Sequence, residues 1–199
     1  MHKKKAVDVV LLPEEKITQK AIEVNAQLIQ KCGSRVVFNK KDCLPHISLA
    51  MGCIDDGDLA DINSTLKDIT RDVQIGSMEI VGIEAQTNAF GETILLFKIG
   101  RSNELQSLHE QVMESMLGFF KHKVSDDMLF DHQVELSTLI WIKDYREKSS
   151  FSHFFPHITL GYGEIEISTP RLTFNAESLA VCHLGNHCTC KDILTSVPL

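Results

Sequence analysis

Two octapeptides of the chain share most of their residues and lie about half a chain apart. The first occupies residues 45–52 (PHISLAMG) and the second occupies residues 156–163 (PHITLGYG). Each begins with a proline, continues as a short apolar run and carries a hydroxyl residue two positions after a histidine. Residues i and i+2 of a strand point to the same face. Each octapeptide therefore predicts a strand with an apolar back and a polar front.

The polar fronts of the two predicted strands consist of the same chemical groups. His46 and Ser48 form the first front, and His157 and Thr159 form the second. Two such strands facing one another would bring together two imidazoles and two hydroxyl groups. Histidine titrates near neutral pH, so one imidazole can act as a base while the other acts as an acid. The hydroxyl groups are suited to donate hydrogen bonds to phosphate oxygens that gain negative charge during a reaction.

Paired H-x-[ST] motifs in apolar strands resemble those of the two-histidine (2H) phosphoesterase superfamily, which includes 2′-5′ RNA ligases and cyclic phosphodiesterases. The resemblance covers most of the chain, because the elements around the motifs also follow in a matching order. It implies an α+β fold with a two-lobed, pseudo-twofold arrangement of antiparallel sheets and flanking helices around a central cleft. It also implies a single bilobal domain over residues 1–199.

The same resemblance implies an enzyme. Its expected reaction is the metal-independent opening of 2′,3′-cyclic phosphates on nucleotides or RNA ends, with 2′-5′ RNA ligation as the reverse chemistry. His46 and His157 would be the catalytic acid and base, in an order that the residues leave open. Ser48 and Thr159 would bind the substrate phosphate. The alternative is a non-catalytic module that binds RNA or a nucleotide on the same fold.

Other kinds of site are less well supported by the sequence. There is no G-x-S-x-G elbow, and no acidic residue is evidently placed to orient either histidine. A zinc site is conceivable in a C-terminal cluster of Cys182, His183, His187, Cys188 and Cys190. That cluster lacks a second C-x-x-C or H-x-x-x-H, so it is a poor tetrahedral set. We expect neither a metal nor a cofactor, and we regard His183 as a weaker candidate for substrate contact.

Periodicity and turn residues predict the order of the elements. Strands are expected at residues 6–12, 44–51, 78–85, 93–99, 178–184 and 187–194, with a tight turn at Gly185-Asn186. Helices are expected to begin at Pro13, Asp58 and Ser102, and the first to end at Gly33. Residues 134–142 fit either a helix or a strand. Hairpins mixed with helices favour an α+β fold with antiparallel sheets.

Composition limits the possible partners. The 199 residues are 43% hydrophobic, which is enough for a core in one compact domain or two small lobes. A net charge of −7 argues against an extended surface for duplex nucleic acid, but not against a small pocket for one phosphate. No run approaches the length of a membrane helix, and the N-terminus resembles a strand more than a signal peptide. We therefore expect a cytoplasmic protein with reduced cysteines; the oligomeric state is not indicated.

Overall fold

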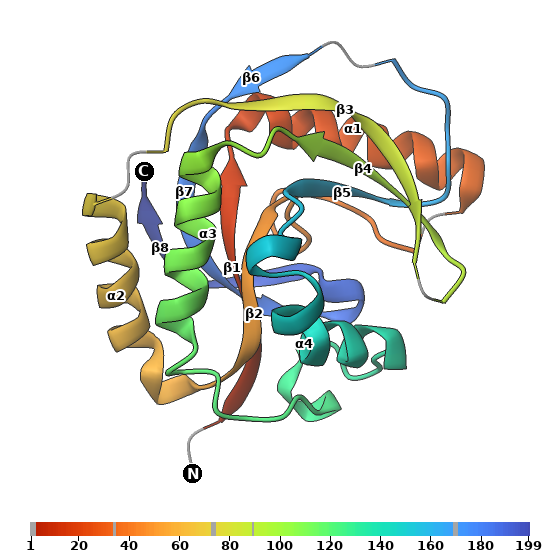
Figure 1. Cartoon of the computed structure of the whole chain (residues 1–199). Helices are drawn as coiled ribbons and strands as arrows, with labels where there is room; N and C mark the ends of the chain where they lie inside the picture. Colours follow the sequence, from red (N-terminus) through yellow and green to blue (C-terminus); the bar gives the residue numbers. More distant parts are fainter. Residues whose placement is uncertain (1–2, 34, 73–74, 89, 169–170) are drawn as a thin grey trace.

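The computed structural model describes residues 3–33, 35–72, 75–88, 90–168 and 171–199, which form two antiparallel four-stranded sheets (Figure 1). Sheet A has the strand order β2-β1-β7-β8, and sheet B has the order β5-β4-β3-β6. The strands of sheet A are β1 (Lys4–Pro13), β2 (Ile47–Asp55), β7 (Ala176–Leu184) and β8 (Cys190–Pro198). The strands of sheet B are β3 (Met78–Thr87), β4 (Thr93–Ile99), β5 (His157–Tyr162) and β6 (Leu172–Phe174).

Four α-helices accompany the sheets in the described residues, which confirms the predicted α+β class. They are α1 (Glu15–Cys32), α2 (Leu59–Asp72), α3 (Asn103–Met116) and α4 (Leu136–Lys148). Short 3₁₀ turns are η1 (Asp56–Asp58), η2 (Asp126–Met128), η3 (Phe151–His153) and η4 (Asn186–Cys188). Two predicted helix ends are confirmed. Gly33 ends α1 in the left-handed region at φ 66°, and the Ser102 hydroxyl accepts a hydrogen bond from Leu105 N–H at the start of α3.

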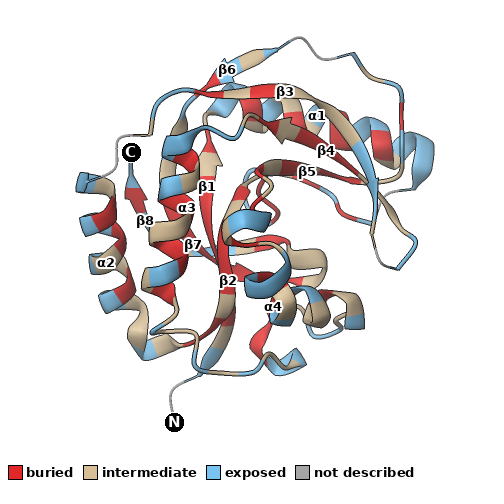
Figure 2. Cartoon of the chain, in the orientation of Figure 1, coloured by how far each residue is buried: buried red, intermediate tan, exposed pale blue. Residues whose placement is uncertain are grey.

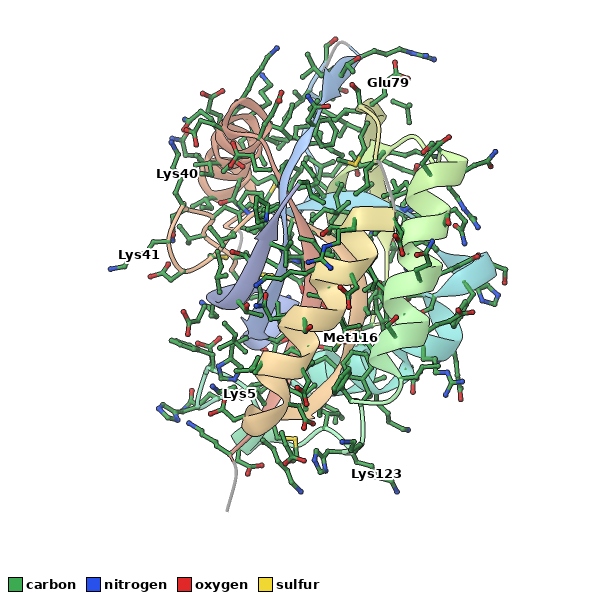
Figure 3. All side chains as sticks on the ribbon, turned by 90° about the vertical axis from the view of Figure 1, so that its left-hand side faces the viewer. Lys5, Lys40, Lys41, Glu79, Met116 and Lys123 are labelled. Carbon is green, nitrogen blue, oxygen red and sulfur yellow. The ribbon has the colours of Figure 1, made fainter. Side chains whose placement is uncertain are left out.

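The helices pack on the sheets in a crossed manner. α1, which follows β1 of sheet A, packs on β5 of sheet B, while α3, which follows β4 of sheet B, packs on β2 of sheet A. Seen from the side, α2 and α3 lie next to one another in front of sheet A, and the labelled Met116 of α3 is fully buried (Figure 3). Buried residues gather on the strands and on the inward faces of the helices, in one cluster that includes residues of both sheets (Figure 2).

The two halves repeat one arrangement around the octapeptides. β2 and β5 are both edge strands, and each pairs with the strand that precedes a helix, β1 or β4. The register shifts between residues 9 and 10 of β1 and between residues 95 and 96 of β4. In both cases the residue left out of the pairing is the leucine after the hydroxyl, Leu49 or Leu160. This shared irregularity supports the pseudo-twofold arrangement; the single domain over residues 1–199 stays a prediction.

Several boundaries differ from the sequence prediction. Pro13 ends β1 instead of opening a helix, and residues 134–142, which fitted either structure, belong largely to α4. The predicted strand at residues 187–194 was wrong at its start. His187 and Cys188 have φ values of 58° and 53°, so the strand begins only at Cys190. The loop takes this form because the Asn186 side chain accepts hydrogen bonds from the start of α4.

Among the helices of the described residues, none combines the length and the apolar character needed to cross a bilayer.

Gly52, the last residue of the first octapeptide, packs so closely against Phe120 that a side chain would collide with it. A Cβ atom at Gly52 would lie 2.3 Å from Phe120 Cγ. We expect Gly52→Ala to lower the free energy of unfolding by about 1–3 kcal/mol, because the ring must move to make room. Gly118→Ala is the control, since its Cβ would have no heavy atom within 4 Å. Urea denaturation that gave both variants equal stability would contradict this packing.

Candidate active site

The two motif histidines lie at corresponding places on the two sheets. His46 directly precedes β2, and His157 is the first residue of β5. The residues that follow them, Ile47 and Ile158, are 1% and 0% exposed, whereas both histidines are only partly buried. β2 and β5 contact one another. The apolar backs of both strands therefore face the core, and the polar fronts lie on the other side.

One type of hydrogen bond holds both imidazole rings. His46 Nδ1 donates to the carbonyl oxygen of Leu44 at 2.7 Å, and His157 Nδ1 donates to that of Phe155, also at 2.7 Å. Each acceptor lies two residues before its histidine. Because Nδ1 is occupied, Nε2 is the nitrogen that remains for exchanging a proton with a ligand.

Burial is the main influence on the charge of both rings. It lowers the pKa of His46 to about 4, opposed by the Leu44 carbonyl and reinforced by the charge of His157. Burial also lowers the pKa of His157, opposed by its hydrogen bond to Phe155. The effect of one histidine on the other indicates that the rings are within electrostatic reach. Both imidazoles are therefore neutral in the free protein at pH 7.

Ser48 has a partner that the sequence analysis did not identify. Its hydroxyl lies 2.6 Å from Oδ2 of Asp8, a residue in the middle of β1 that is fully buried. The same Oδ2 lies 3.7 Å from His46 Nε2. Asp8 does not orient the His46 ring, because the nitrogen that holds the ring, Nδ1, bonds to the Leu44 carbonyl. The sequence signal for this acid was that Asp8 is the single charged residue inside the apolar run at residues 6–12.

In sheet B, the described residue at the corresponding position is not an acid. Thr159 pairs with Leu96 of β4, as Ser48 pairs with Val10 of β1. Asp8 lies two residues before Val10 in sheet A, and Ile94 lies two residues before Leu96 in sheet B. Ile94 therefore occupies the position equivalent to Asp8.

A cation lies near His157, on the same strand as Ile94. Lys98 is the cross-strand partner of His157, and its Nζ is 3.1 Å from a carboxylate oxygen of Glu84 and 5.5 Å from the ring centre of Phe155. The first motif thus has a buried carboxyl group beside it, whereas the second has a lysine that is paired with Glu84. Nothing in the sequence pattern singled out Lys98 either.

In the part of the chain that the structure describes, the C-terminal cysteines and histidines do not by themselves form a set of potential metal ligands. His183 Nε2 donates to the Met128 carbonyl at 2.9 Å, and His187 Nδ1 lies 3.1 Å from the Tyr162 hydroxyl oxygen. His183 also borders a hollow of about 700 Å³ that neither motif histidine lines. These contacts give His183 and His187 other partners.

A different trio offers metal-ligating atoms. Within the described residues, one atom each of Asp8, His46 and Cys190 lie within 4.8 Å of one another. A metal bound there would occupy Nε2 of His46, the nitrogen needed for proton transfer. Metal binding and proton transfer at this ring therefore exclude one another.

Comparison with known proteins gives a fold but no family. No protein-family model and no curated protein matches the chain. Among solved structures, that of Escherichia coli LigT in apo form matches with a TM-score of 0.53 at 12% identity, covering 99% of this chain and 98% of the other. The likeness is one of fold. A structure of E. coli LigT complexed with phosphate matches with a TM-score of 0.49 at 11% identity over the same shares of the chains.

The hydrogen bonds of the two rings predict their tautomers. A carbonyl oxygen can only accept, so both His46 and His157 must carry a proton on Nδ1. We expect two-dimensional ¹H–¹⁵N spectra of the imidazoles at pH 7 to show the neutral Nδ1–H form for both residues. The exposed His153 is the comparison, since its ring should show the solution mixture of tautomers. An Nε2–H form of either motif histidine would contradict the geometry.

Proposed function

We propose that the protein is a phosphoesterase that opens 2′,3′-cyclic phosphates of nucleotides or RNA ends without a metal ion. The observation that carries the proposal is the pair of imidazoles, one from each half, held by the same hydrogen bond and within electrostatic reach of one another. The fold shared with LigT and the resemblance of the two motifs to those of the 2H superfamily support it.

The proposed reaction uses one imidazole to remove a proton and the other to supply one. The neutral ring takes a proton from water while the water oxygen bonds to phosphorus. The bond from phosphorus to one ribose oxygen then breaks, and the protonated ring gives its proton to that oxygen. The product is a ribose phosphate monoester. His46 and His157 perform these two steps in an order that remains open in the proposal.

The hydroxyl groups of Ser48 and Thr159 are proposed to donate hydrogen bonds to the non-bridging phosphate oxygens. Negative charge grows on these oxygens during attack, so donors fixed beforehand lower the energy of the transition state. Ligation of RNA ends of the 2′-5′ type would be the reverse reaction on the same groups.

A binding module without turnover is the alternative. It would use the same hydroxyl groups to hold an RNA end or a nucleotide, but it would not need two imidazoles able to exchange protons. Incubation with a panel of 2′,3′-cyclic nucleotides and short RNAs with cyclic ends distinguishes the two functions. Binding without the appearance of a phosphate monoester would favour the module.

The two histidines should be required as a pair. We expect His46→Ala and His157→Ala each to reduce kcat on a 2′,3′-cyclic nucleotide by about 10²–10⁴-fold, because each removes one partner of the proton transfer. Ser48→Ala and Thr159→Val should cost less, about 10–10³-fold, because each hydroxyl is one of several donors. The double histidine variant should be little worse than the worse single variant. His153→Ala, an exposed histidine, is the matched control.

Circular dichroism should show that these variants remain folded. Near-normal turnover by either single histidine variant would rule out the paired mechanism and would move the binding module to first place.

The pH dependence should also reflect the two rings. Burial lowers both imidazole pKa values below the ordinary 6.5, that of His46 to about 4. The base must be neutral and the acid protonated, so kcat/KM should follow a bell with its maximum between about pH 4 and 6.5. Each limb should disappear when one histidine is replaced. A maximum above pH 7 would contradict the assignment of both titrations to these rings.

Activity should survive the removal of metal ions. The proposed steps need only imidazole and hydroxyl groups, so dialysis against EDTA should leave kcat unchanged within about twofold. Loss of activity in EDTA that zinc or manganese restores would contradict the proposal. It would instead favour a metal bound by Asp8, His46 and Cys190.

A further inference from the structure

The carboxyl group of Asp8 is enclosed in the centre of sheet A. Asp8 pairs with Met51 of β2 on one side and with Cys182 of β7 on the other, and it has no exposed surface. Its Oδ2 contacts the Ser48 hydroxyl at 2.6 Å. Its Oδ1 has no hydrogen-bond partner among the described residues. An ionised carboxylate with one oxygen left unsatisfied would be very unfavourable in such surroundings.

Among the described residues, the titratable groups that face Asp8 provide no fixed positive charge to offset its ionisation. The titratable residues that face it from the neighbouring elements are His46 before β2, Tyr145 of α4, Cys182 of β7, Cys188 of η4 and Cys190 of β8. Burial keeps His46 neutral and the Tyr145 hydroxyl and Cys190 thiol protonated, since it lowers the first pKa and raises the other two. Burial likewise raises the pKa of Asp8 well above its ordinary value, opposed by the hydrogen bond from Ser48.

We propose that Asp8 is a positioning residue that retains its proton and thereby directs the Ser48 hydroxyl toward the substrate phosphate. The inference rests on the proposed function, which places Ser48 against that phosphate. Asp8 itself touches Ser48 and acts through it.

The direction of one hydrogen bond decides what Ser48 can do. If Asp8 is ionised, the Ser48 O–H donates to Oδ2 and is lost to the substrate. If Asp8 carries a proton on Oδ2, the carboxylic acid donates to the Ser48 oxygen, and the Ser48 O–H is free to donate to a phosphate oxygen. The distance of 2.6 Å suits both directions. When Asp8 is protonated, its O–H donates to the Ser48 oxygen and the Ser48 O–H donates to the phosphate, so the two hydrogen bonds have the same direction.

Sheet B offers an internal comparison. Thr159 corresponds to Ser48, but Ile94 stands where Asp8 would be. The Thr159 hydroxyl therefore cannot be directed in the same way. The two halves share the histidine and the hydroxyl, and they differ in whether a buried acid controls the hydroxyl. A change at Asp8 should consequently affect Ser48 and leave the contribution of Thr159 unaltered.

The protonation of Asp8 can be measured without substrate and without a variant. The ¹³Cγ chemical shift of Asp8 in the wild-type protein should stay at the value of a carboxylic acid from pH 5 to pH 7. A shift typical of a carboxylate at pH 5 would overturn the proposal. Asp144, an acid of α4 that bonds to Lys148, is the comparison, because that partner lowers its pKa and its shift should be that of a carboxylate.

Unfolding gives a second measurement that needs no turnover. Below the ordinary Asp pKa of about 3.9 both folded and unfolded chains bind the proton, whereas above it only the folded chain does. The unfolding equilibrium constant of the wild type should therefore rise by up to about tenfold per pH unit relative to Asp8→Asn, until the folded pKa is reached. Comparison with Asp8→Asn cancels the opposite contributions of the buried histidines. Parallel curves from pH 5 to pH 7 would overturn the proposal.

The positioning role is tested by a double-mutant cycle on kcat/KM with a 2′,3′-cyclic nucleotide. Asp8→Leu should cost about 10-fold or more, and nothing further in a Ser48→Ala background, because it acts through that hydroxyl. Its cost should be unchanged in a Thr159→Val background. Asp8→Asn should recover most of the loss, since an amide can donate to Ser48 as the acid does. Equal losses of kcat/KM in Asp8→Leu and Asp8→Asn would overturn the positioning role. So would an Asp8→Leu loss that is as large in the Ser48→Ala background as in the wild type.

The two kinds of measurement separate the two proposals. If no cyclic phosphate is opened but Asp8 remains protonated by both physical measurements, the proposed function fails and the assignment of the proton stands. If turnover occurs and the cycle shows no coupling between Asp8 and Ser48, the positioning role fails and the function stands.

Discussion

The hydrogen bond from an imidazole Nδ1 to the carbonyl two residues earlier is the constraint on which the site depends. It occurs at His46 and at His157 with the same length, and a proline stands between donor and acceptor in both. Proline fixes its own φ and restricts the residue before it to extended conformations. The backbone therefore fixes the position of the carbonyl oxygen independently of the imidazole ring. This explains why the repeated octapeptides begin with proline.

The pseudo-twofold arrangement creates a pair of similar groups, and the differences between the halves give them unequal surroundings. A carboxyl group, Asp8, lies beside the first motif, and an amine, Lys98, lies beside the second. Two imidazoles in identical surroundings would have the same affinity for a proton. Acid–base catalysis needs one ring to be protonated while the other is neutral. On the proposed function, a difference between the two halves such as the carboxyl group beside His46 is what can distinguish the two rings.

Much of the fold follows from local patterns. The two motif strands, the cap at Ser102 and the left-handed end of α1 at Gly33 could all be predicted, because each depends on residues close together in sequence. The crossed packing of α1 on β5 and of α3 on β2 leaves no local signal. Helix α4 was ambiguous because its apolar residues are not confined to one face, and Leu136 and Trp141 remain exposed.

The residues of the candidate site likewise differ in whether local sequence could predict them. The histidines and hydroxyl residues were identified from their spacing, since the chemistry resides in a tripeptide. Asp8 was missed because it lies 40 positions from Ser48, and only the pairing of β1 with β2 brings them together. The loop at His187 was mispredicted for a similar reason, since its left-handed conformation depends on Asn186 bonding to the start of α4.

Burial favours the uncharged forms of the ionisable groups in the ligand-free site. Burial lowers the pKa values of the two imidazoles and raises the pKa of Asp8, so it favours the uncharged form of all three groups. A monoanionic phosphate that enters such a site favours protonation of the imidazole it approaches, because an opposite charge stabilises the charged form. On the proposed function, the substrate itself therefore helps to create the acid that the reaction requires. The net charge of −7 on the whole chain disfavours long polyanions, which on the same proposal favours a single terminal phosphate over a phosphodiester backbone as the ligand.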